Sequence, residues 1–291
     1  MSEASVGIIG GSGLYHIEAM TDVSEMKVDT PYGAPSDGIV LGTLEGTRVA
    51  FLPRHGRGHR LNPSEVPYRA NIYALKSLGV ERIISVNAVG SLREDMEPTH
   101  IVIPGQLIDR TKARPSTFFD NGIVAHVAFA EPFCPQLRDI VHDAAIAAGA
   151  TVHKGGTYVV MEGPQFSTRA ESELYRSWKA DIIGMTALPE AKLAREAEMC
   201  YAVVAFVTDF DCWHPDHESV TTEMVIRALL SGADTARATV QNAVKMLAVE
   251  RSCSCGTALS NAIVTAASLV PPETLRNLEP IAGRYLSAQG R

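Results

Sequence analysis

Residues 6–13 read Val-Gly-Ile-Ile-Gly-Gly-Ser-Gly, a short apolar run that ends in glycines around a single hydroxyl. The apolar half is typical of a buried strand, and the glycine half of a tight turn whose backbone N–H groups can converge on an anion. Two familiar nucleotide motifs do not fit, because the turn has no P-loop lysine and His16 stands where a dinucleotide fingerprint needs its third glycine. The turn therefore predicts a cradle for a small oxyanion, with Ser12 as a donor, or a strand-to-helix connection without a ligand.

Composition restricts the kind of partner that the chain can bind. Its 291 residues are 46% hydrophobic and carry a formal net charge of -7. Such a chain can build an ordinary core, but it has no overall positive charge to neutralise nucleic acid or an anionic membrane. No apolar stretch approaches the ~20 residues of a bilayer span, and the chain does not open on a signal-peptide pattern. We expect a cytoplasmic protein that binds small molecules, with no nucleic-acid or membrane partner.

The five cysteines are scattered, which is not typical of a secreted disulfide framework. Three of them are expected to be buried free thiols: Cys134, Cys200 and Cys212. Cys253 and Cys255 lie one residue apart in a polar segment and could form a redox pair, or half of a zinc site completed by His214 and His217. Zinc sites favour Cys-x-x-Cys spacing, so the sequence favours two solvated, reduced thiols and no metal site.

Short apolar runs alternate with helical patterns, which predicts an α/β fold. Strands are expected at 39–44 and 48–52, which form a hairpin, and at 82–86, 101–103, 157–161, 182–185 and 201–208. Helices are expected at 67–78, 136–148, 169–179 and 189–198. Apolar residues at helical spacing predict one long helix over 221–249, with a weak point and possible kink at Gly232.

Residues 251–257 are the one convincing linker in the chain. The simplest division is one domain over 1–250, followed by a linker and helical extension of the same domain over 251–291. Within that extension, residues 258–270 are small and apolar, and Pro271 and Pro272 end the stretch. The tail beyond these prolines is expected to be helical or partly frayed.

Cationic side chains follow the predicted strand at 48–52. Residues 53–60 hold three arginines and two histidines in an otherwise acidic chain, and such a local concentration of cations is typical of an anion site. Arg54 and His55 lie closest to the strand end, where open α/β sheets place ligands, so they are the better candidates. A solvated loop would explain Arg57 and Arg60.

Two carboxylates, Asp209 and Asp211, follow the apolar strand at 201–208. Residues two apart at a strand end face the same way, although a pair of turn-forming aspartates is the alternative explanation. Residues 203–207 are apolar enough to be buried on both faces. A carboxylate that emerges from such a strand is expected to have a raised pKa and to serve as a proton donor.

Seven ordered motifs resemble those of the trimeric purine nucleoside phosphorylases and, within them, the 5′-methylthioadenosine phosphorylases. The motifs lie at 10–13 (GGSG), 29–33 (DTPYG), 54–56 (RHG), 87–91 (NAVGS), 162–169 (EGPQFSTR), 185–190 (MTALPE) and 208–213 (TDFDCW). The resemblance extends from Gly7 to about Leu230. It implies a mixed central sheet forming a distorted barrel surrounded by helices, with active sites at the interfaces of a homotrimer or dimer of trimers.

The resemblance also implies a role for each matched residue. The phosphate ligands would be Ser12, Arg54, His55, Asn87, Ala88 through its backbone N–H, and Thr186. The nucleoside would contact Phe166, Met185, Asp209, Phe210 and Asp211, with His55 and Asp209 as catalytic residues. The specificity pocket for the 5′ substituent would use Ser167, Thr222, Val225, Ile226 and, from a neighbouring subunit, His126.

Asp209 indicates which purine the site would take, because family members that use 6-oxopurines place asparagine at this position. A protonated carboxyl can donate to purine N7 while a carboxylate accepts from the exocyclic amine of adenine. We therefore expect a pentosyltransferase that cleaves S-methyl-5′-thioadenosine with phosphate to adenine and 5-methylthioribose 1-phosphate, with no cofactor. Asp209 would assist the leaving purine.

Three alternatives stay open at this point. One is a purine nucleoside phosphorylase for inosine, guanosine or methylthioinosine, and another is a non-catalytic nucleotide-binding module. The third concerns adenosine, because Thr222 departs from the valine expected there. Its hydroxyl could admit a 5′-hydroxyl substrate.

Overall fold

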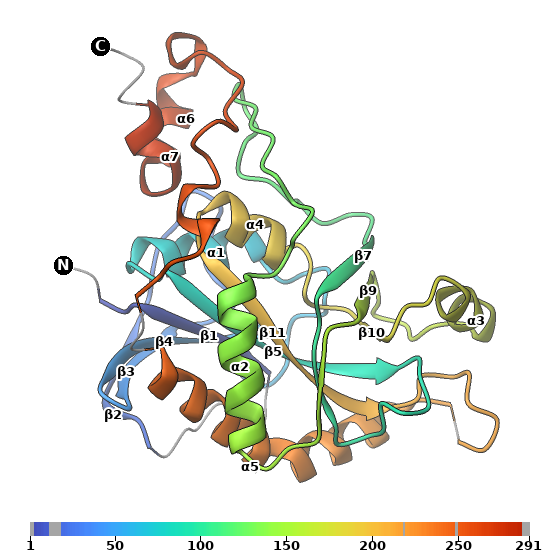
Figure 1. Cartoon of the computed structure of the whole chain (residues 1–291). Helices are drawn as coiled ribbons and strands as arrows, with labels where there is room; N and C mark the ends of the chain where they lie inside the picture. The colour runs from blue at the N-terminus through green and yellow to red at the C-terminus, as the bar shows by residue number, and fades with distance from the viewer. Residues whose placement is uncertain (1–2, 12–18, 218, 248–249, 287–291) are drawn as a thin grey trace.

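The computed structural model describes residues 3–11, 19–217, 219–247 and 250–286. Over these residues the chain forms a mixed sheet of 11 strands surrounded by helices (Figure 1). The expected α/β fold with a mixed central sheet is thereby confirmed. Ser12, the hydroxyl of the glycine turn, lies outside the described residues.

Two long parallel strands, β5 (Arg82–Ser91) and β11 (Cys200–Asp209), run through the centre of the sheet. The beginning of β5 also pairs with β1 (Val6–Gly10), and its end pairs with β10 (Ile182–Gly184). The sheet therefore branches at β5. One path runs β2-β3-β4-β1-β5-β10-β9-β7, and the other continues from β11 to β6 and β8.

The remaining strands are β2 (Thr21–Met26), β3 (Ile39–Leu44), β4 (Thr47–Pro53), β6 (Ile101–Ile103), β7 (Gln106–Arg110), β8 (Val152–Lys154) and β9 (Thr157–Met161). The β3–β4 hairpin is confirmed. Strands β2, β7 and β8 were not expected, because their residues are mostly polar and at least partly exposed and so carry no apolar pattern. The strand expected at 82–86 is longer, because the small residues 87–91 continue its pairing with β11 and β10.

The helices are α1 (Tyr68–Ser77), α2 (Pro135–Ala147), α3 (Arg169–Ser177), α4 (Glu190–Glu196), α5 (Thr222–Met246), α6 (Pro272–Asn277) and α7 (Glu279–Leu286). Each of the five helical patterns before residue 250 therefore corresponds to a helix. Among the described residues, no helix has both the length and the apolar composition needed to cross a membrane.

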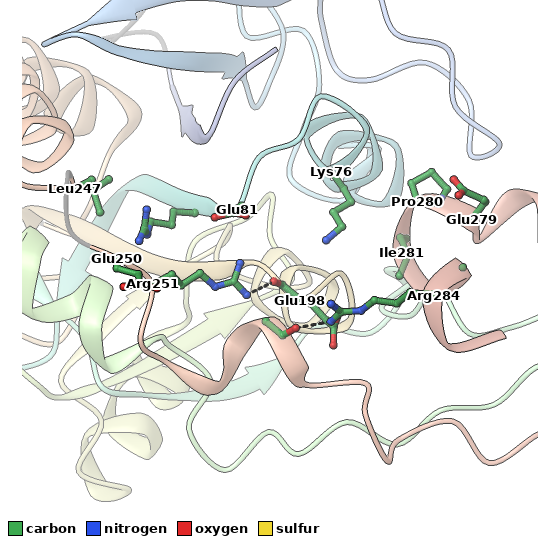
Figure 2. A pocket seen from close by; sticks show the side chains of 13 residues that line it. Lys76, Glu81, Glu198, Leu247, Glu250, Arg251, Glu279, Pro280, Ile281 and Arg284 are labelled. Atoms are coloured by element: carbon green, nitrogen blue, oxygen red, sulfur yellow. Dashed lines mark hydrogen bonds and ion pairs between the residues drawn. The ribbon is translucent and has the colours of Figure 1, made fainter. Parts of the chain in front are cut away.

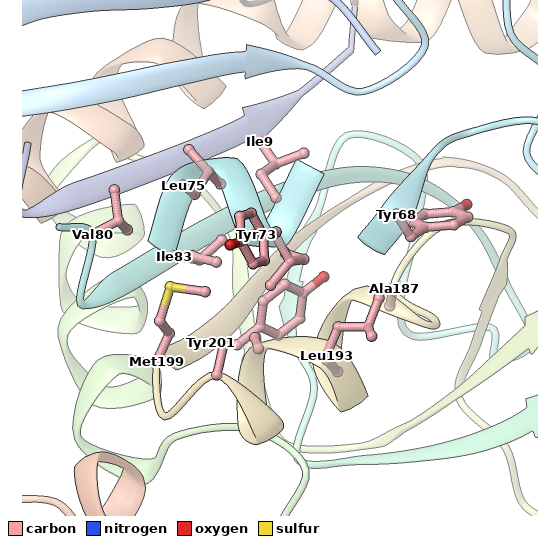
Figure 3. Close-up of a cluster of buried hydrophobic side chains, with 14 of the residues drawn as sticks. Ile9, Tyr68, Tyr73, Leu75, Val80, Ile83, Ala187, Leu193, Met199 and Tyr201 are labelled. Atoms are coloured by element: carbon pink, nitrogen blue, oxygen red, sulfur yellow. The ribbon is translucent and has the colours of Figure 1, made fainter. Parts of the chain in front are cut away.

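Alternate residues of the central strands enter two different apolar clusters. Ile9, Ile83 and Tyr201 belong to a cluster with α1, α4 and α7, part of which is drawn in Figure 3. Their neighbours Ile8 and Ile84 belong to a second cluster with α2 and α5. Because successive strand residues point to opposite faces, the central sheet is covered by helices on both sides. This burial explains the nearly continuous apolar runs of β1, β5 and β11.

Helix α5 continues through Gly232 without a break, as one helix over Thr222–Met246. The side chain of Thr221 caps its beginning by accepting a hydrogen bond from the Met224 N–H at 3.2 Å. A Cβ atom at Gly232 would lie 2.0 Å from the ring of Phe206 on β11. The glycine is therefore the point where α5 comes close to the strand.

The C-terminal segment is more ordered near residue 254 than the sequence indicates. Residues 254–257 form a 3₁₀ helix, and Cys255 is buried rather than solvated. Residues 258–270 form turns, a bridge between Ala125 and Ile263, and a short 3₁₀ helix instead of a helix. Helices α6 and α7 follow Pro271, which confirms the helical tail.

Glu198 joins this C-terminal segment to the body of the protein. Figure 2 shows Arg251 and Arg284 reaching Glu198 from two sides of a charged pocket. Arg251 Nη2 donates to the Glu198 carbonyl at 2.7 Å, and Arg284 forms an ion pair with the Glu198 carboxylate. The Glu198 carboxylate also accepts hydrogen bonds from the Leu259 N–H at 2.9 Å and the Tyr285 hydroxyl at 2.7 Å.

The close approach at Gly232 predicts the effect of adding one methyl group. Gly232→Ala should lower the free energy of unfolding by about 1–3 kcal/mol, because overpacking against Phe206 outweighs the better helix propensity of alanine. Urea denaturation measures the change. The matched control is Gly283→Ala on α7, where the added Cβ meets its nearest atom at an ordinary 3.4 Å. Equal effects of the two substitutions would contradict the packing argument.

Candidate active site

A cavity of about 750 Å³ lies at the carboxyl ends of β5 and β11. Its wall is formed by residues from segments far apart in the sequence: 54–65, 86–90, 161–166, 183–186, 206–211 and 220–236. Carboxyl ends of parallel strands share one edge of a sheet, which explains why these segments converge. Gly11, at the beginning of the glycine turn, also lines the cavity.

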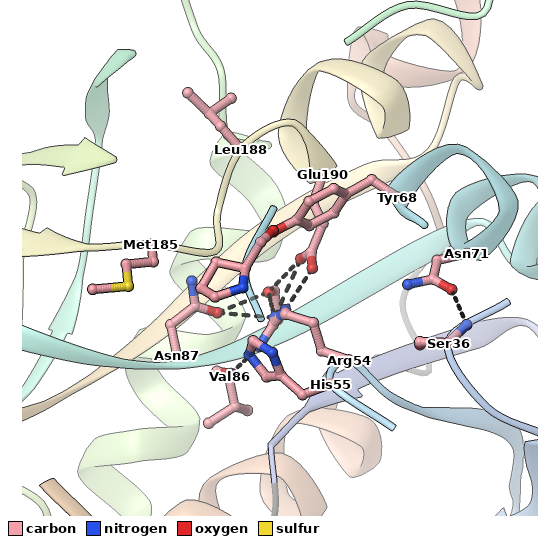
Figure 4. Close-up of polar contacts among 12 residues, drawn as sticks. Ser36, Arg54, His55, Tyr68, Asn71, Val86, Asn87, Met185, Leu188 and Glu190 are labelled. Atoms are coloured by element: carbon pink, nitrogen blue, oxygen red, sulfur yellow. Dashed lines mark hydrogen bonds and ion pairs between the residues drawn. The ribbon is translucent and has the colours of Figure 1, made fainter. Parts of the chain in front are cut away.

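Arg54 is buried at one end of this cavity and is held on several sides (Figure 4). Its Nε lies 2.5 Å from Glu190 Oε1, and its Nη2 lies 3.2 Å from Glu190 Oε2. The Glu190 carboxylate raises the pKa of Arg54 despite the opposing effect of burial. The ion pair fixes the plane of the guanidinium and keeps its charge in the apolar interior.

Residues of β5 complete the contacts of Arg54. Nη2 donates to Ser85 Oγ at 2.6 Å and to Asn87 Oδ1 at 3.1 Å, and Nη1 donates to the Val86 carbonyl at 3.1 Å. Nη1 has two hydrogens, so one of them has no partner among the described residues. That hydrogen is available to an anion in the cavity.

His55 follows Arg54 in the cavity wall, and its pKa is lowered to about 4. Burial is the main cause, and the nearby charge of Arg54 adds to it. His55 Nδ1 lies 2.8 Å from the Leu61 carbonyl, so the neutral ring carries its proton on Nδ1. Nε2 is then an acceptor. His55 can accept a proton or a hydrogen bond from an anion, but at neutral pH it adds no positive charge.

Arg57 and Arg60 differ from these two residues, as expected. Both are exposed, and Arg57 pairs with Glu25 at 2.9 Å. Arg60 lies 3.8 Å from Asp37, although it also reaches the edge of the cavity.

Asp209 and Asp211 line the cavity together with Thr208. Asp209 is 5% exposed and Asp211 is 4% exposed, and burial raises the pKa of both carboxyls, as expected. Asp209 Oδ2 lies 2.6 Å from the Thr208 hydroxyl, and Oδ1 accepts the Asp211 N–H at 2.8 Å. Asp209 ends β11, but Asp211 lies beyond the strand at a φ of +53°, so strand alternation is not what brings them together.

Gly90 on β5 makes room for this carboxylate pair. A Cβ atom at residue 90 would lie 2.9 Å from Asp209 Oδ1 and 3.4 Å from Asp211 Cβ. Every side chain larger than hydrogen would therefore displace Asp209 or the neighbouring strand.

Met185, Thr186 and Phe166 lie in the same cavity wall. Arg114, which is buried, holds the segments that carry them, because it donates to the Met185 carbonyl at 2.6 Å and to the Glu162 carbonyl at 2.5 Å. Phe166 is 40% exposed and presents an aromatic ring beside the cavity.

Apolar side chains of α5 and the preceding segment form the opposite end of the cavity. The residues in this wall are Val220, Thr222, Val225, Ile226 and Leu229. Apart from the Thr222 hydroxyl, these side chains offer no hydrogen-bond partner, so this end suits an apolar substituent.

Three residues expected at the site are not in the cavity wall. Phe210 points into an apolar cluster and packs edge-on against Trp213 at 5.9 Å. Ser167 does not line the cavity, and its hydroxyl lies 3.6 Å from Met161 Sδ. His126 is exposed, and its backbone N–H donates to the carbonyl of Ala262, in the C-terminal segment, at 2.8 Å.

Several buried polar residues of the site were not expected from the sequence. They are Ser85, Arg114, Glu190 and Tyr201, whose hydroxyl lies 2.8 Å from Glu190 Oε2. Glu190 lies inside the motif at 185–190, but a glutamate at a helix start is common on surfaces. Burial alone distinguishes it here.

Comparison with known proteins agrees with this geometry. Residues 5–245 match the model of the phosphorylase superfamily. The S-methyl-5′-thioadenosine phosphorylase of Koribacter versatilis is 57% identical over 287 residues, covering 99% of this chain and 98% of the relative. The enzyme of the same name from Chloroflexus aurantiacus is 58% identical over 99% of this chain and 100% of its own.

Solved structures give the same result. A methylthioadenosine phosphorylase from an antarctic soil metagenomic library has a TM-score of 0.92 at 54% identity, covering 97% of this chain and 99% of that one. A methylthioadenosine phosphorylase from Schistosoma mansoni, solved in complex with adenine, has a TM-score of 0.82 at 40% identity, covering 85% and 93%. The chain therefore belongs to the phosphorylase superfamily, among its S-methyl-5′-thioadenosine phosphorylases.

Proposed function

We propose that this chain catalyses the phosphorolysis of S-methyl-5′-thioadenosine to adenine and 5-methylthioribose 1-phosphate. The observation that carries the proposal is one cavity with three chemically different parts. Arg54 and His55 offer contacts for an anion, Asp209 and Asp211 offer buried carboxyls for a purine, and the start of α5 offers an apolar wall. Relatives that are more than 50% identical over nearly their whole length have the corresponding name.

At the anion end, inorganic phosphate is the co-substrate and nucleophile. Its oxygens accept hydrogen bonds from the free Nη1 hydrogen of Arg54, the backbone N–H of Ala88 and the hydroxyls of Thr186 and Ser12. Asn87 contributes through its contact with Arg54 and through its own side-chain amide. His55 Nε2 accepts from a protonated phosphate oxygen. Holding phosphate below C1′ turns a bimolecular attack into one within the complex. We propose no further cofactor for this step.

At the purine end, Asp209 assists the leaving group. A phosphate oxygen forms the new bond to C1′ as the bond from C1′ to purine N9 breaks, and the electron pair moves into the purine. Asp209, whose pKa is raised by burial, donates a proton to N7, while the other carboxyl accepts from the exocyclic amine. Phe166 and Met185 pack against the base and ribose.

At the apolar end, Val225 and Ile226 contact the methylthio group. Thr222 offers one hydroxyl in this wall, which supports adenosine as a secondary substrate. Ser167 contributes indirectly through Asp211, and Phe210 supports the purine site from behind.

We further propose that the chain works as a homotrimer or a dimer of trimers in the cytoplasm. Phe166 and Ile226 are 40% and 52% exposed beside the cavity, as expected of apolar side chains that a neighbouring subunit covers. His126, which does not line its own cavity, would then complete the pocket of a neighbouring subunit. Residues 251–286 are proposed to be an extension of the same domain, supported by their contacts with Glu198.

A substrate panel tests this function. The protein is incubated with methylthioadenosine, adenosine, methylthioinosine and inosine, each with and without phosphate, and the released base is quantified. Methylthioadenosine should give the fastest phosphate-dependent release, adenosine a slower one, and the two 6-oxopurine nucleosides little. Preferred release of hypoxanthine would favour the 6-oxopurine alternative. If none of the four nucleosides releases its base in a phosphate-dependent way, the proposed enzymatic activity is contradicted.

Asp209→Asn tests the leaving-group role. The substitution removes the proton donor while keeping size, so kcat on methylthioadenosine should fall by about 10²–10⁴-fold. The ratio of kcat/KM for methylthioinosine to that for methylthioadenosine should rise at the same time. Asp216→Asn, which changes a nearby exposed carboxylate, is the matched control and should leave kcat unchanged. Unchanged turnover in Asp209→Asn would reject the assignment.

The lowered pKa of His55 predicts how stability depends on pH. Unfolded histidine binds a proton below pH 6.5, whereas His55 in the folded chain does so only below about pH 4. The unfolded state therefore binds more protons in this range. The contribution of His55 to the free energy of unfolding is complete above pH 6.5 and is lost as the pH falls to about 4. His55→Gln should reduce the loss of unfolding free energy over this range by about 2–3 kcal/mol. His217→Gln, at an exposed position, should leave the curve of unfolding free energy against pH as steep as in the wild type. Identical curves for the wild type and His55→Gln would contradict a buried neutral histidine.

A further inference from the structure

Four of the five cysteines meet at one point, away from the residues of the cavity wall. The Sγ atoms of Cys134, Cys200, Cys253 and Cys255 all lie within 4.8 Å of one another. Among the described residues this is the one group of three or more cysteine, histidine or acidic side chains placed to bind a metal ion. His214 and His217 are not part of it, so the pairing of the two C-terminal cysteines with these histidines is wrong.

Three separate parts of the chain supply the four thiols. Cys134 directly precedes α2, Cys200 begins β11, and Cys253 and Cys255 lie at the 3₁₀ helix of the C-terminal segment. A backbone hydrogen bond of 2.9 Å from Cys134 N–H to the Tyr201 carbonyl fixes the first two relative to each other. Three of the sulfurs belong to buried residues, and Cys253 is partly buried.

The distances fit a shared metal better than a disulfide. Zinc holds thiolates at about 2.3 Å in a tetrahedron, which places the sulfurs of a site about 3.8 Å apart. A disulfide needs about 2.05 Å. The sulfurs of Cys200 and Cys253 are separated by 3.3 Å, and all four cysteines are free thiols. Four mutually adjacent sulfurs are needed for a tetrathiolate site, whereas a disulfide needs only two.

The surroundings also suit bound thiolates. A divalent ion with four thiolates carries two excess negative charges. Arg251 interacts with Cys200 and Cys253, and Arg195 interacts with Cys255, so two cations are close. The Leu137 N–H at the start of α2 favours a negative sulfur at Cys134.

We propose that these four cysteines form a structural site for zinc. Four protein ligands leave no open position for water or substrate, so the ion stabilises and does not catalyse. The site joins the C-terminal segment to the starts of β11 and α2. It is independent of the proposed phosphorolysis, and the sequence-based expectation of two solvated thiols with no metal is revised accordingly.

Metal analysis of the full-length protein tests the site. The protein is purified in reducing buffer without chelators, and its zinc content is measured by mass spectrometry before and after a mercurial reagent blocks the thiols. About one zinc per chain should be present and should be released by the mercurial. Replacement of zinc by cobalt(II) should produce the strong visible absorption of a tetrahedral thiolate site.

Variants identify the ligands. Cys255→Ser and Cys134→Ser should each reduce bound zinc at least about tenfold, since three thiolates and a hydroxyl form a weaker site. The matched control Cys212→Ser changes the one cysteine outside the cluster and should keep the full zinc content. Cobalt(II) spectra of the wild-type chain keep the test decisive if a variant fails to fold. Protein that contains no zinc after purification and shows no cobalt(II) absorption would overturn the proposal. This holds whether its intact mass shows the thiols to be free or paired in disulfides.

Discussion

The buried ion pair between Arg54 and Glu190 is the interaction on which the architecture of the site depends. A guanidinium with almost no exposure survives in the interior only because a carboxylate, a serine, an asparagine amide and a backbone carbonyl surround it. These partners come from the middle of β5 and the start of α4, and Arg54 itself directly follows β4. The pair therefore fixes how three elements meet, and with them the part of the cavity that is proposed to bind an anion.

The branched sheet supplies the second constraint. Because β5 pairs with β1, β10 and β11, its carboxyl half has neighbours on both edges. Small residues are required where these neighbouring segments come close. Gly90 is the clearest case, since it lies under the Asp209 and Asp211 carboxyls. Burial of those carboxyls raises their pKa values, so the packing of the strands and the acidity of the site have one physical origin.

Sequence reasoning identified the features that have a local signal. The apolar runs of β1, β3, β4, β5 and β11 and the periodicity of α5 were sufficient to predict the α/β class, and the motifs placed Arg54, His55 and Asp209 in the cavity wall. The polar strand β2 was missed because it carries no apolar pattern, and the role of Glu190 was missed because it depends on burial and on a partner more than a hundred residues away. The convergence of Cys134 and Cys200 with the C-terminal cysteines was missed for the same reason: spacing rules detect only ligands that are close in sequence.

Strand β11 connects the cysteine cluster with the cavity, and this connection affects how substitutions in the chain act. Its first residue, Cys200, lies beside the thiols of the C-terminal segment, and its last, Asp209, lines the cavity at its proposed purine site. Ten residues of extended chain separate these functions by about 30 Å. If both proposed sites hold, substitutions near the tail act on how long the folded chain survives and substitutions at the far end act on which base is released, so stability and selectivity can change separately along one strand.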